Sequence, residues 1–164
     1  MWIVGGAIRD FLSNKIINDI DFVTNMDMDL FLKKLSSEKI KIYQNNIQYK
    51  TISIILDNNE YQITSFRKDL ITFGRQAYVS SAESLYQDSL RRDFTVNALY
   101  LNRKGHLIDP LGGFNDIMKK ELKFIGDPAL RIEEDYLRVI RFCRFFATFP
   151  NKDISYLLKN KIMK

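Results

Sequence analysis

The chain has 164 residues, enough for one compact domain or for one domain and the start of another. Its apolar runs are shorter than the roughly eighteen residues of a membrane span, and it starts without the basic segment of an export signal. Its single cysteine, Cys143, excludes an internal disulfide. Together these features favour a cytoplasmic protein. The net charge of +5 favours a polyanionic partner such as nucleic acid, although a composition rich in Lys and Asn explains it equally well.

The N-terminal segment has the pattern of a strand, a glycine turn and a helix. Residues 2–4 form a short apolar run, Gly5 and Gly6 interrupt it, and residues 7–12 can form a helical turn. In this order of elements the backbone N–H groups face whatever lies above the turn, which is typical of an anion-binding site.

Two carboxylates accompany a second predicted strand, residues 20–23. Asp19 and Asp21 are two positions apart, so both side chains project from the same face. Like charges held there repel each other unless a cation lies between them, and Mg²⁺ suits the position because it prefers oxygen ligands. Alternatively, one Asp caps a turn and the other is solvated at a strand edge. The Gly-Gly-x-x-Arg-Asp sequence of residues 5–10 favours the metal site.

The next segment predicts a helix followed by adjacent strands. Residues 25–38 have helical spacing with Asp27 as the cap, and residues 57–59, Asp-Asn-Asn, have the composition of a hairpin turn. Strands are predicted at residues 40–43, 49–56 and 61–66. A hairpin between neighbouring strands favours a mixed or antiparallel sheet, and a doubly wound parallel fold fits poorly.

The remaining elements are less regular. Residues 67–84, with Gly74 and Arg75 among them, are polar and aperiodic and predict a mobile loop over the site. Residues 109–113 break the chain sharply and predict a hinge or a domain boundary. The other expected elements are a hairpin of residues 96–101 and 106–108 around a turn at 102–105, a short strand at 122–125, and a helix from Pro128 to about Phe149.

A charged triplet, Arg91-Arg92-Asp93, stands just before an apolar strand. An arginine there can hold a phosphate or a ribose, and Asp93 can orient that arginine. The alternative is a solvated charged turn.

The last predicted helix carries a row of charged side chains at intervals of three, which places them on one face. The row consists of Asp135, Arg138, Arg141 and Arg144. The face expected in the core consists of Val139, Phe142 and Phe146. A surface pair of Glu134 with Arg138, worth about 0.2–0.5 kcal/mol, is the alternative, but three arginines exceed what such a pair needs and favour a bound polyanion. His106 is interpreted as a surface residue, and Cys143 as a core residue.

The chain closely resembles the class II tRNA nucleotidyltransferases in four segments that stand in the family's order: GGAIRDFL…NDIDF, RRDFTVNALY, IDPLGGFNDI and EEDYLRVIRFCRFF. These are the bacterial-type CCA-adding enzymes, grouped with bacterial poly(A) polymerases. The resemblance implies an α+β fold, with a polymerase-beta-like nucleotidyltransferase head of mixed or antiparallel sheet in residues 1–112 and the start of a helical neck in residues 113–164. It implies Mg²⁺-dependent transfer of CMP and AMP from CTP and ATP to the tRNA 3′ end, with release of pyrophosphate.

The resemblance also implies roles for the candidate residues. Asp19 and Asp21 would bind Mg²⁺ and, with the metal, activate the tRNA 3′-hydroxyl for in-line attack. The nucleotide-binding residues would be Gly6 and Arg9 at the phosphates, Arg92 and Asp93 at the ribose and phosphate, Asp135 and Arg138 at the base, and Arg141 and Arg144 in an electropositive wall. An Asp–Arg pair offers acceptors and donors in fixed geometry, so a small rotation could suit either C or A. Residues 109–113 would be the spring between head and neck.

Three features depart from the family's pattern. Gln62 stands where members often have an acidic residue, which leaves two carboxylates for the metal. Met1 lies almost on the first strand, and the sequence stops at Lys164, before the helical body and tail domains that hold tRNA in the family. An expressed fragment, a truncated gene product and half of a split enzyme all fit such a chain. The alternative functions are a poly(A) polymerase, a partial enzyme that adds only CC or only A, and an inactive nucleotide- or RNA-binding fragment.

Overall fold

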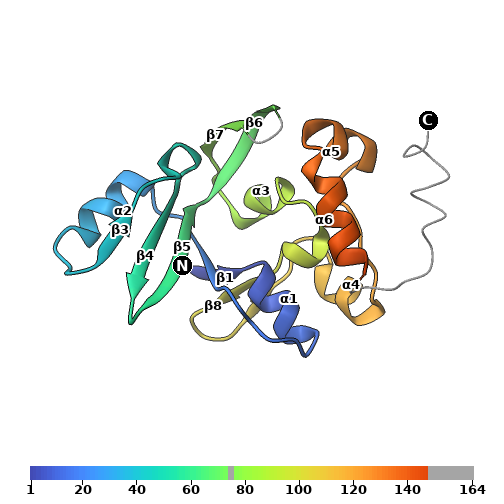
Figure 1. Ribbon diagram of the computed structural model, residues 1–164, viewed down its shortest axis with the longest axis horizontal. Coiled ribbons are helices and arrows are strands. Elements are labelled where there is room, and N and C mark those ends of the chain that lie inside the picture. The colour runs from blue at the N-terminus through green and yellow to red at the C-terminus, as the bar shows by residue number, and fades with distance from the viewer. Residues whose placement is uncertain (74–75, 148–164) are drawn as a thin grey trace.

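The computed structural model describes residues 1–73 and 76–147, and its centre is a seven-stranded sheet (Figure 1). The strand order is β3-β4-β5-β2-β1-β8-β9. The strands are β1 (Trp2–Val4), β2 (Asp21–Thr24), β3 (Lys41–Tyr43), β4 (Thr51–Leu56), β5 (Asn59–Ser65), β8 (Tyr100–Asn102) and β9 (Leu107–Ile108). β2 and β5 are parallel and the other neighbouring pairs are antiparallel, so the predicted mixed sheet is confirmed.

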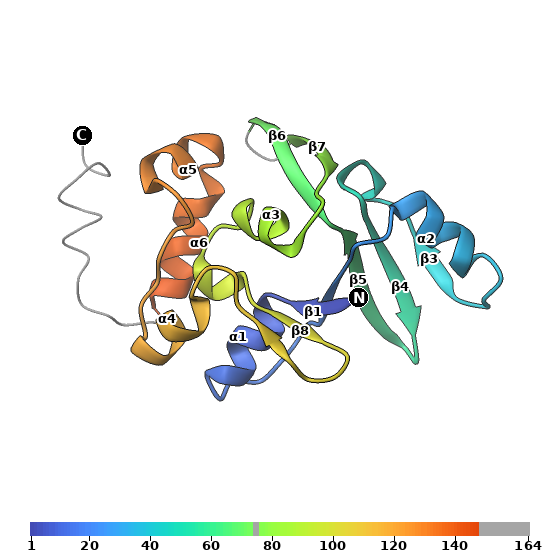
Figure 2. The same ribbon diagram turned by 180° about the vertical axis from the view of Figure 1, so that it is seen from behind.

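The helices lie around the sheet, with α2 at one end of the molecule and α4, α5 and α6 at the other (Figure 2). The α-helices are α1 (Gly6–Leu12), α2 (Met28–Leu35), α3 (Leu85–Leu90), α4 (Gly113–Lys119), α5 (Pro128–Glu134) and α6 (Leu137–Phe146), and the 3₁₀ turns are η1 (Ile47–Tyr49) and η2 (Thr95–Asn97). The sequence did not predict α3 and α4. Both are short, and their positions depend on packing against other elements.

The N-terminal strand, glycine turn and helix form as predicted. Gly5 has a φ of 74° and donates its N–H to the carbonyl oxygen of Leu99 at 3.1 Å, which fixes the turn against the segment before β8. A side chain here would be strained by the positive φ. β2 begins at Asp21, one residue later than predicted, and pairs with β1 on one side and β5 on the other.

The predicted cap and hairpin turn of the middle segment are also confirmed. Asp27 caps α2 by accepting a hydrogen bond from the backbone N–H of Asp29 at 3.0 Å, although α2 is shorter than predicted. Asp57 and Asn58 have φ values of 50° and 62° and join β4 to β5. Two consecutive residues with positive φ are what a two-residue hairpin turn of type I′ requires.

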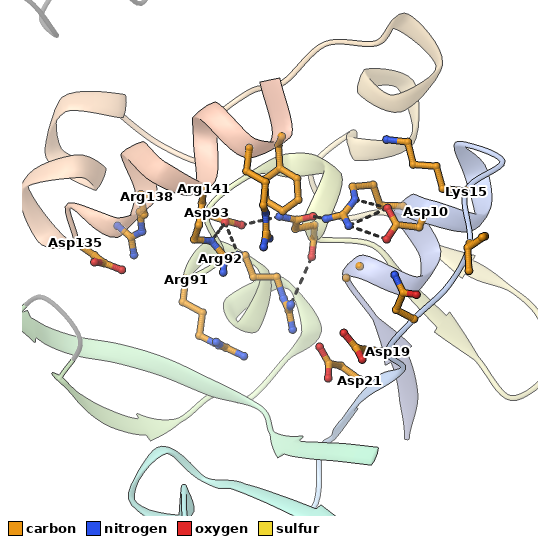
Figure 3. A pocket seen from close by; sticks show the side chains of 18 of the residues that line it. Asp10, Lys15, Asp19, Asp21, Arg91, Arg92, Asp93, Asp135, Arg138 and Arg141 are labelled. Carbon is orange, nitrogen blue, oxygen red and sulfur yellow. Dashed lines mark hydrogen bonds and ion pairs between the residues drawn. The ribbon is translucent and has the colours of Figure 1, made fainter. Parts of the chain in front are cut away.

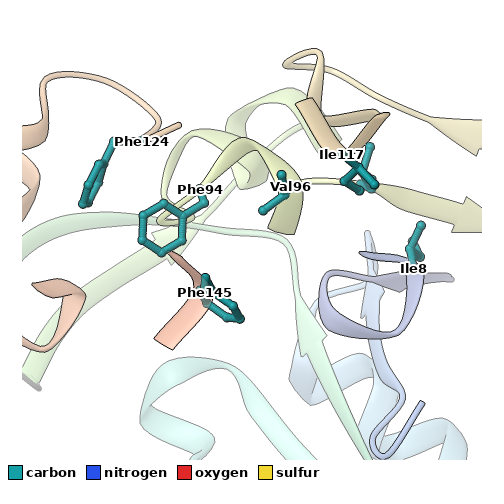
Figure 4. Close-up of a cluster of buried hydrophobic side chains, with 7 residues drawn as sticks. Ile8, Phe94, Val96, Ile117, Phe124 and Phe145 are labelled. Carbon is teal, nitrogen blue, oxygen red and sulfur yellow. The ribbon is translucent and has the colours of Figure 1, made fainter. Parts of the chain in front are cut away.

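Three clusters of buried side chains form the hydrophobic core. The first joins α1, the η2 segment, α4 and α6 (Figure 4) and consists of Ile8, Phe94, Val96, Leu99, Ile117, Phe124 and Phe145. The second lies on β1, β2, β8 and the residue between β5 and β6, and consists of Val4, Val23, Phe66 and Tyr100. The third fixes α2 to β4 and β5 and consists of Met28, Phe31, Ile52 and Ile63. Because Phe145 belongs to the first cluster, α6 is held beside α1 and η2.

The mobile loop predicted at residues 67–84 is wrong, because most of this segment is a β-hairpin. β6 (Arg67–Phe73) pairs antiparallel with β7 (Gln76–Ser81), with a register shift between Asp69 and Ile71. Tyr78 and Val79 in β7 favour this pairing, and the charged start of β6 conceals the alternation in the sequence. Gly74 and Arg75 lie outside the described residues.

Two predicted strands are wrong in part. The segment 96–101 starts as η2, because Thr95 donates a side-chain hydrogen bond to Asp116 at 2.6 Å and Asn97 donates one to Asp93 at 2.9 Å. These bonds draw the backbone away from a strand ladder, so that only Tyr100–Asn102 pairs as β8. The strand predicted at 122–125 is reduced to a single bridge between Phe94 and Phe124.

The single helix predicted for residues 128–149 is two helices, α5 and α6. Asp135 interrupts them with an extended φ of −155°, and its side chain accepts a hydrogen bond from the N–H of Leu137 at 3.0 Å. Residues 148 and 149 lie outside the described part of the chain. Cys143 is exposed, so its predicted place in the core is wrong: Phe145 is the buried apolar residue on α6, and Phe142 packs against the same cluster.

Residues 109–113 form a tightly bonded turn at the start of α4. Asp109 accepts hydrogen bonds from the N–H groups of Gly113 at 2.9 Å and Phe114 at 3.0 Å, and Gly112 has a φ of 78°. A Cβ on Gly113 would lie 2.1 Å from the carbonyl oxygen of Thr95, so α4 approaches η2 more closely than a larger residue allows. The spring at this turn and the division of head from neck between residues 112 and 113 stay predictions.

Gly113→Ala is expected to destabilise the fold by about 1–3 kcal/mol, because the added methyl group overlaps the backbone of η2. The free energy of unfolding in urea measures this loss. Gly6→Ala is the control, since a Cβ on Gly6 has its nearest contact at 3.6 Å and alanine favours the helix. A Gly113→Ala protein as stable as the wild type would contradict the close packing of α4 on η2.

Candidate active site

One cavity of about 740 Å³ collects residues from distant parts of the sequence (Figure 3). The ten residues singled out in the sequence all line it: Gly6, Arg9, Asp19, Asp21, Arg92, Asp93, Asp135, Arg138, Arg141 and Arg144. The other lining residues are Gly5, Asp10, Lys15, Ile16, Asn18, Arg67, Arg91, Asn97 and Phe145. Seven arginines and one lysine face five aspartates, so the lining is electropositive and suits a polyanionic ligand.

Asp19 and Asp21 lie next to each other at the start of β2 (Figure 3). Although Asp21 is exposed at the mouth of the cavity, desolvation by the surrounding protein raises its pKa; the positive charge of Arg92 opposes this shift and the negative charge of Asp19 adds to it. A cation between the two carboxylates would remove their repulsion. No group of three or more His, Cys, Asp or Glu side chains in the described ranges is placed to hold a metal, and Gln62 stands opposite Asp21 on β5.

Arg9 is held in the cavity by hydrogen bonds and an aromatic ring. Its guanidinium donates to both carboxylate oxygens of Asp10 at 2.9 Å and to Asn97 Oδ1 at 2.6 Å. It also lies 4.5 Å from the centre of the Phe145 ring. Asp10 therefore orients Arg9, because a bidentate pair fixes a guanidinium in one plane.

Arg92 is oriented by Asp88, a residue that no motif in the sequence singles out. Asp88 is fully buried and accepts hydrogen bonds from Arg92 Nη2 at 3.2 Å, Arg91 Nε at 2.9 Å and the hydroxyl of Tyr100 at 2.9 Å. Burial raises the pKa of Asp88, but the two arginines and these hydrogen bonds outweigh it, and the net pKa lies below the usual value. Asp88 therefore stays ionised and keeps Arg92 in place.

Asp93 does not orient Arg92, which corrects the sequence interpretation. Its carboxylate accepts hydrogen bonds from the Nε of Arg141 at 2.6 Å, from Asn97 Nδ2 at 2.9 Å and from the N–H of Phe94 at 2.9 Å. Arg141 lies 48 residues further along the chain. Asp93 thus joins the η2 segment to α6, and the charged triplet is neither a solvated turn nor a local unit.

Asp135 and Arg138, two of the four charged residues in the predicted row, have different surroundings. Arg138 is buried and donates from Nη1 to Glu134 Oε2 and to the carbonyl oxygen of Arg131, both at 2.6 Å. The alternative Glu134–Arg138 pair therefore forms, with Arg138 buried and Glu134 partly exposed. Asp135 and Arg138 lie near each other at the same side of the cavity (Figure 3), and no ion pair joins them in the part of the chain that the structure describes.

Arg67 and Arg91 also line the cavity, and the sequence did not single out Arg67. Its guanidinium donates to the carbonyl oxygen of Tyr49 and lies 3.8 Å from Asp69. Burial and the nearby charge of Arg91 lower the pKa of Arg67 to about 10. Arg67 belongs to β6, so the hairpin contributes a positive charge to the cavity wall. No sequence signal distinguishes it, because its partners come from other elements.

Residues 1–123 match the sequence pattern of the poly A polymerase head domain. The chain belongs to this family. It is 35% identical over 151 residues to the human mitochondrial CCA tRNA nucleotidyltransferase 1, across 92% of this chain and 35% of that protein. It is 36% identical over 148 residues to the CCA-adding enzyme of Leuconostoc citreum, across 89% of this chain and 36% of that protein. The chain therefore spans about a third of the length of the curated relatives it matches.

Solved structures of relatives share the fold of this poly A polymerase head domain. The Bacillus stearothermophilus CCA-adding enzyme in complex with CTP superposes with a TM-score of 0.76 at 30% identity, across 88% of this chain and 34% of that chain. A tRNA nucleotidyltransferase complexed with a primer tRNA and an incoming ATP analog gives 0.69 at 27% identity, across 88% and 40%.

These matches confirm the polymerase-beta-like fold and the resemblance to tRNA nucleotidyltransferases. Within the described ranges of this poly A polymerase head domain, no helix has the length and apolar character needed to cross a membrane.

Proposed function

We propose that this chain is the catalytic core of a CCA-adding tRNA nucleotidyltransferase. It transfers CMP and AMP from CTP and ATP to the tRNA 3′ end and releases pyrophosphate. The observation that carries this proposal is that Asp19 and Asp21 share one cavity with an arginine-rich wall. The names of the relatives support the substrates, since they are CCA-adding enzymes and their solved structures include complexes with CTP and with primer tRNA.

Arg9 and Arg92 bind the triphosphate in this proposal. Asp10 binds the guanidinium of Arg9, and Asp88 binds that of Arg92. Both guanidinium groups are therefore oriented before the nucleotide arrives and lose little conformational entropy on binding. Gly6 leaves the backbone beside Arg9 open to a phosphate. Asp93 acts on the ribose side of the nucleotide through Asn97 and Arg141, whose side chains donate hydrogen bonds to its carboxylate.

Arg141 and Arg144 complete the electropositive wall at the exposed side of the cavity. Arg141 is fixed by Asp93, and the guanidinium of Arg144 lies 4.6 Å from the centre of the Phe145 ring. Their charges attract the polyanionic substrates, and this attraction weakens as salt increases.

Asp19 and Asp21 fit a Mg²⁺ ion, which usually takes one or two carboxylates and completes its shell with water and substrate phosphates. Their side chains offer oxygen donors next to each other, and desolvation disfavours an uncompensated charge on Asp21. When bound, Mg²⁺ polarises the α-phosphate and increases the acidity of the 3′-hydroxyl. Arg9 and Arg92, which bind the triphosphate in this proposal, also hold the leaving pyrophosphate once the 3′-hydroxyl has attacked the α-phosphorus.

Asp135 and Arg138 select the base. Arg138 is held by Glu134 and by the carbonyl oxygen of Arg131, and Asp135 is held by the backbone of Leu137. The two side chains thus present acceptors and donors from fixed positions, which is what discrimination between bases by hydrogen bonding requires.

The test is incorporation of labelled CMP and AMP into tRNA that lacks its CCA end, with each nucleotide omitted in turn. We expect incorporation from CTP alone and incorporation from ATP only after CTP has been supplied. Polymerisation of AMP without CTP would identify a poly(A) polymerase, and addition of one nucleotide type would identify a partial enzyme. Absent incorporation with Mg²⁺ and high protein, despite measurable CTP binding, would identify a binding fragment and overturn the proposal.

Asp135→Ala is expected to lower the preference for CTP over UTP by about 10-fold, because a hydrogen-bonding pair is worth about 1–3 kcal/mol of discrimination. The measurement is the ratio of kcat/KM for the two nucleotides. Glu133→Ala is the control, since Glu133 is exposed and outside the cavity. An equal loss for both nucleotides would place the contribution of Asp135 in folding or catalysis, contrary to a role in base selection.

A further inference from the structure

We propose that Gln62 and Tyr43 hold the 3′ end of the acceptor RNA on the open face of the β2-β5-β4-β3 half of the sheet. This inference rests on the proposed nucleotidyl transfer, and it adds the side from which the RNA strand reaches Asp21. The register of the strands, the exposure of the side chains and the order of strands around Asp21 carry it.

A row of side chains crosses four strands at the level of Asp21. Asp21 pairs with Gln62 on β5, Gln62 pairs with Ser53 on β4, and Ser53 pairs with Tyr43 on β3. Residues directly opposite each other in neighbouring strands project from the same face of a sheet. The row therefore runs from the candidate metal site to the outer edge of the sheet.

This face is open at the level of the row. Asp21 and Gln62 are exposed, Ser53 is half-buried, and 49% of Tyr43 is accessible to solvent. The opposite face is the one that α2 covers, where Ile52 and Ile63 are buried. A ligand strand can thus lie along the row without displacing a helix.

In-line transfer determines which substrate lies on which side of Asp21. β1 borders β2 on one side and leads into the glycine turn with Arg9, and Arg92 bonds Tyr100 of the next strand, β8. The two arginines proposed to bind the triphosphate therefore lie on this side, although Arg67 lines the cavity from β6. β5 borders β2 on the other side, and Gln62 is not among the described residues that line that cavity. The attacking and leaving oxygens must lie roughly in line across the α-phosphorus. A triphosphate on the arginine side therefore requires the attacking hydroxyl to approach from the side of Gln62.

The chemistry of the row suits an RNA strand. The amide of Gln62 both donates and accepts hydrogen bonds, so it can bind a ribose hydroxyl without adding a third negative charge beside Asp19 and Asp21. Three strand spacings of about 4.8 Å separate Tyr43 from Asp21, so its ring meets a nucleotide upstream of the terminal one. Stacking on such a ring tolerates any base.

The next row on this face has no excess of positive charge. Lys41 and Glu60 are both exposed and both lie opposite Ile55, so their charges offset each other. The contribution of this face to RNA affinity therefore comes from stacking and hydrogen bonding and not from contacts with phosphates.

The test is the affinity of the protein for a 5′-fluorescent tRNA acceptor minihelix that lacks CCA, measured by anisotropy. Gln62→Ala is expected to weaken binding about 3- to 10-fold, the effect of one lost hydrogen bond, and Tyr43→Ala about 10-fold or more, the effect of one lost stacking platform. Tyr43→Phe keeps the ring and is expected to bind like the wild type. Gln48→Ala, an exposed glutamine on η1 outside the row, is the matched control.

The same variants are then compared for CTP affinity and, in the transfer assay, for KM. We expect the KM for RNA to rise in Gln62→Ala and Tyr43→Ala while the CTP affinity and the KM for CTP stay unchanged. Three results would each overturn the proposal. They are unaltered RNA affinity in both variants, RNA binding too weak to detect in the wild type, and a loss of CTP affinity that parallels the loss of RNA affinity. Failure of the proposed function gives a different result: the wild type incorporates no nucleotide, yet the two variants still weaken RNA binding.

Discussion

Asp21→Asn is expected to lower the rate of nucleotidyl transfer by about 10³-fold or more, because it removes one of the two carboxylates available to the metal while preserving the size of the side chain. Asp19→Asn is expected to behave in the same way. Single-turnover incorporation of labelled CMP into tRNA lacking CCA measures the effect, since it separates the chemical step from product release.

The stability of the Asp21→Asn protein is expected to be unchanged or slightly higher. Desolvation and the charge of Asp19 disfavour the ionised form of Asp21, so a neutral side chain relieves a cost in the folded protein. Asp29→Asn, an exposed aspartate on α2 outside the cavity, is the matched control for activity. If Asp21→Asn retained a tenth of the wild-type rate, the assignment of Asp21 to the metal would be wrong.

Asp88→Asn is expected to reduce the free energy of unfolding by about 3–5 kcal/mol at pH 7, because it leaves Arg91 and Arg92 without their buried counter-charge. Urea unfolding measures this difference. Asp57→Asn is the control: Asp57 is exposed in the hairpin turn, its positive φ suits asparagine, and the change should stay within about 0.5 kcal/mol.

The same variant makes a prediction about acid stability. The folded-state pKa of Asp88 lies below its usual value, so its contribution is fully present above the unfolded pKa of about 3.9 and is lost as the pH falls through the lower folded pKa. The gap in unfolding free energy between wild type and Asp88→Asn should therefore narrow below about pH 4. A gap under about 1 kcal/mol at pH 7, or one that stays constant in acid, would show that the buried ion pairs contribute little.

The elements that the sequence predicted correctly are those with local signals. Gly5 and Gly6 mark the turn between β1 and α1, Asp27 marks the start of α2, and residues 57–59 mark the β4–β5 hairpin. In each case the backbone conformation depends on residues within a few positions, through a positive φ or a side chain that bonds its own backbone.

The elements that the sequence missed depend on partners elsewhere in the chain. The β6–β7 hairpin was mistaken for a loop because charged side chains interrupt its alternation. The predicted strand at residues 96–101 starts as a 3₁₀ turn because buried carboxylates, Asp93 and Asp116, bind its polar side chains. The last helix divides at Asp135, whose side chain bonds the backbone of the next helix in place of continuing the first.

The sequence by itself determined the family and the ten residues around the cavity, because the motifs that carry them are short and retain their residue types and spacing. Only the tertiary structure decided how these residues pair. Arg9 bonds Asn97 across 88 residues and Arg141 bonds Asp93 across 48, while the fully buried Asp88 holds Arg92. The physical reason is that buried charges must find counter-charges wherever packing brings them, and such pairs leave no periodic signal in the sequence.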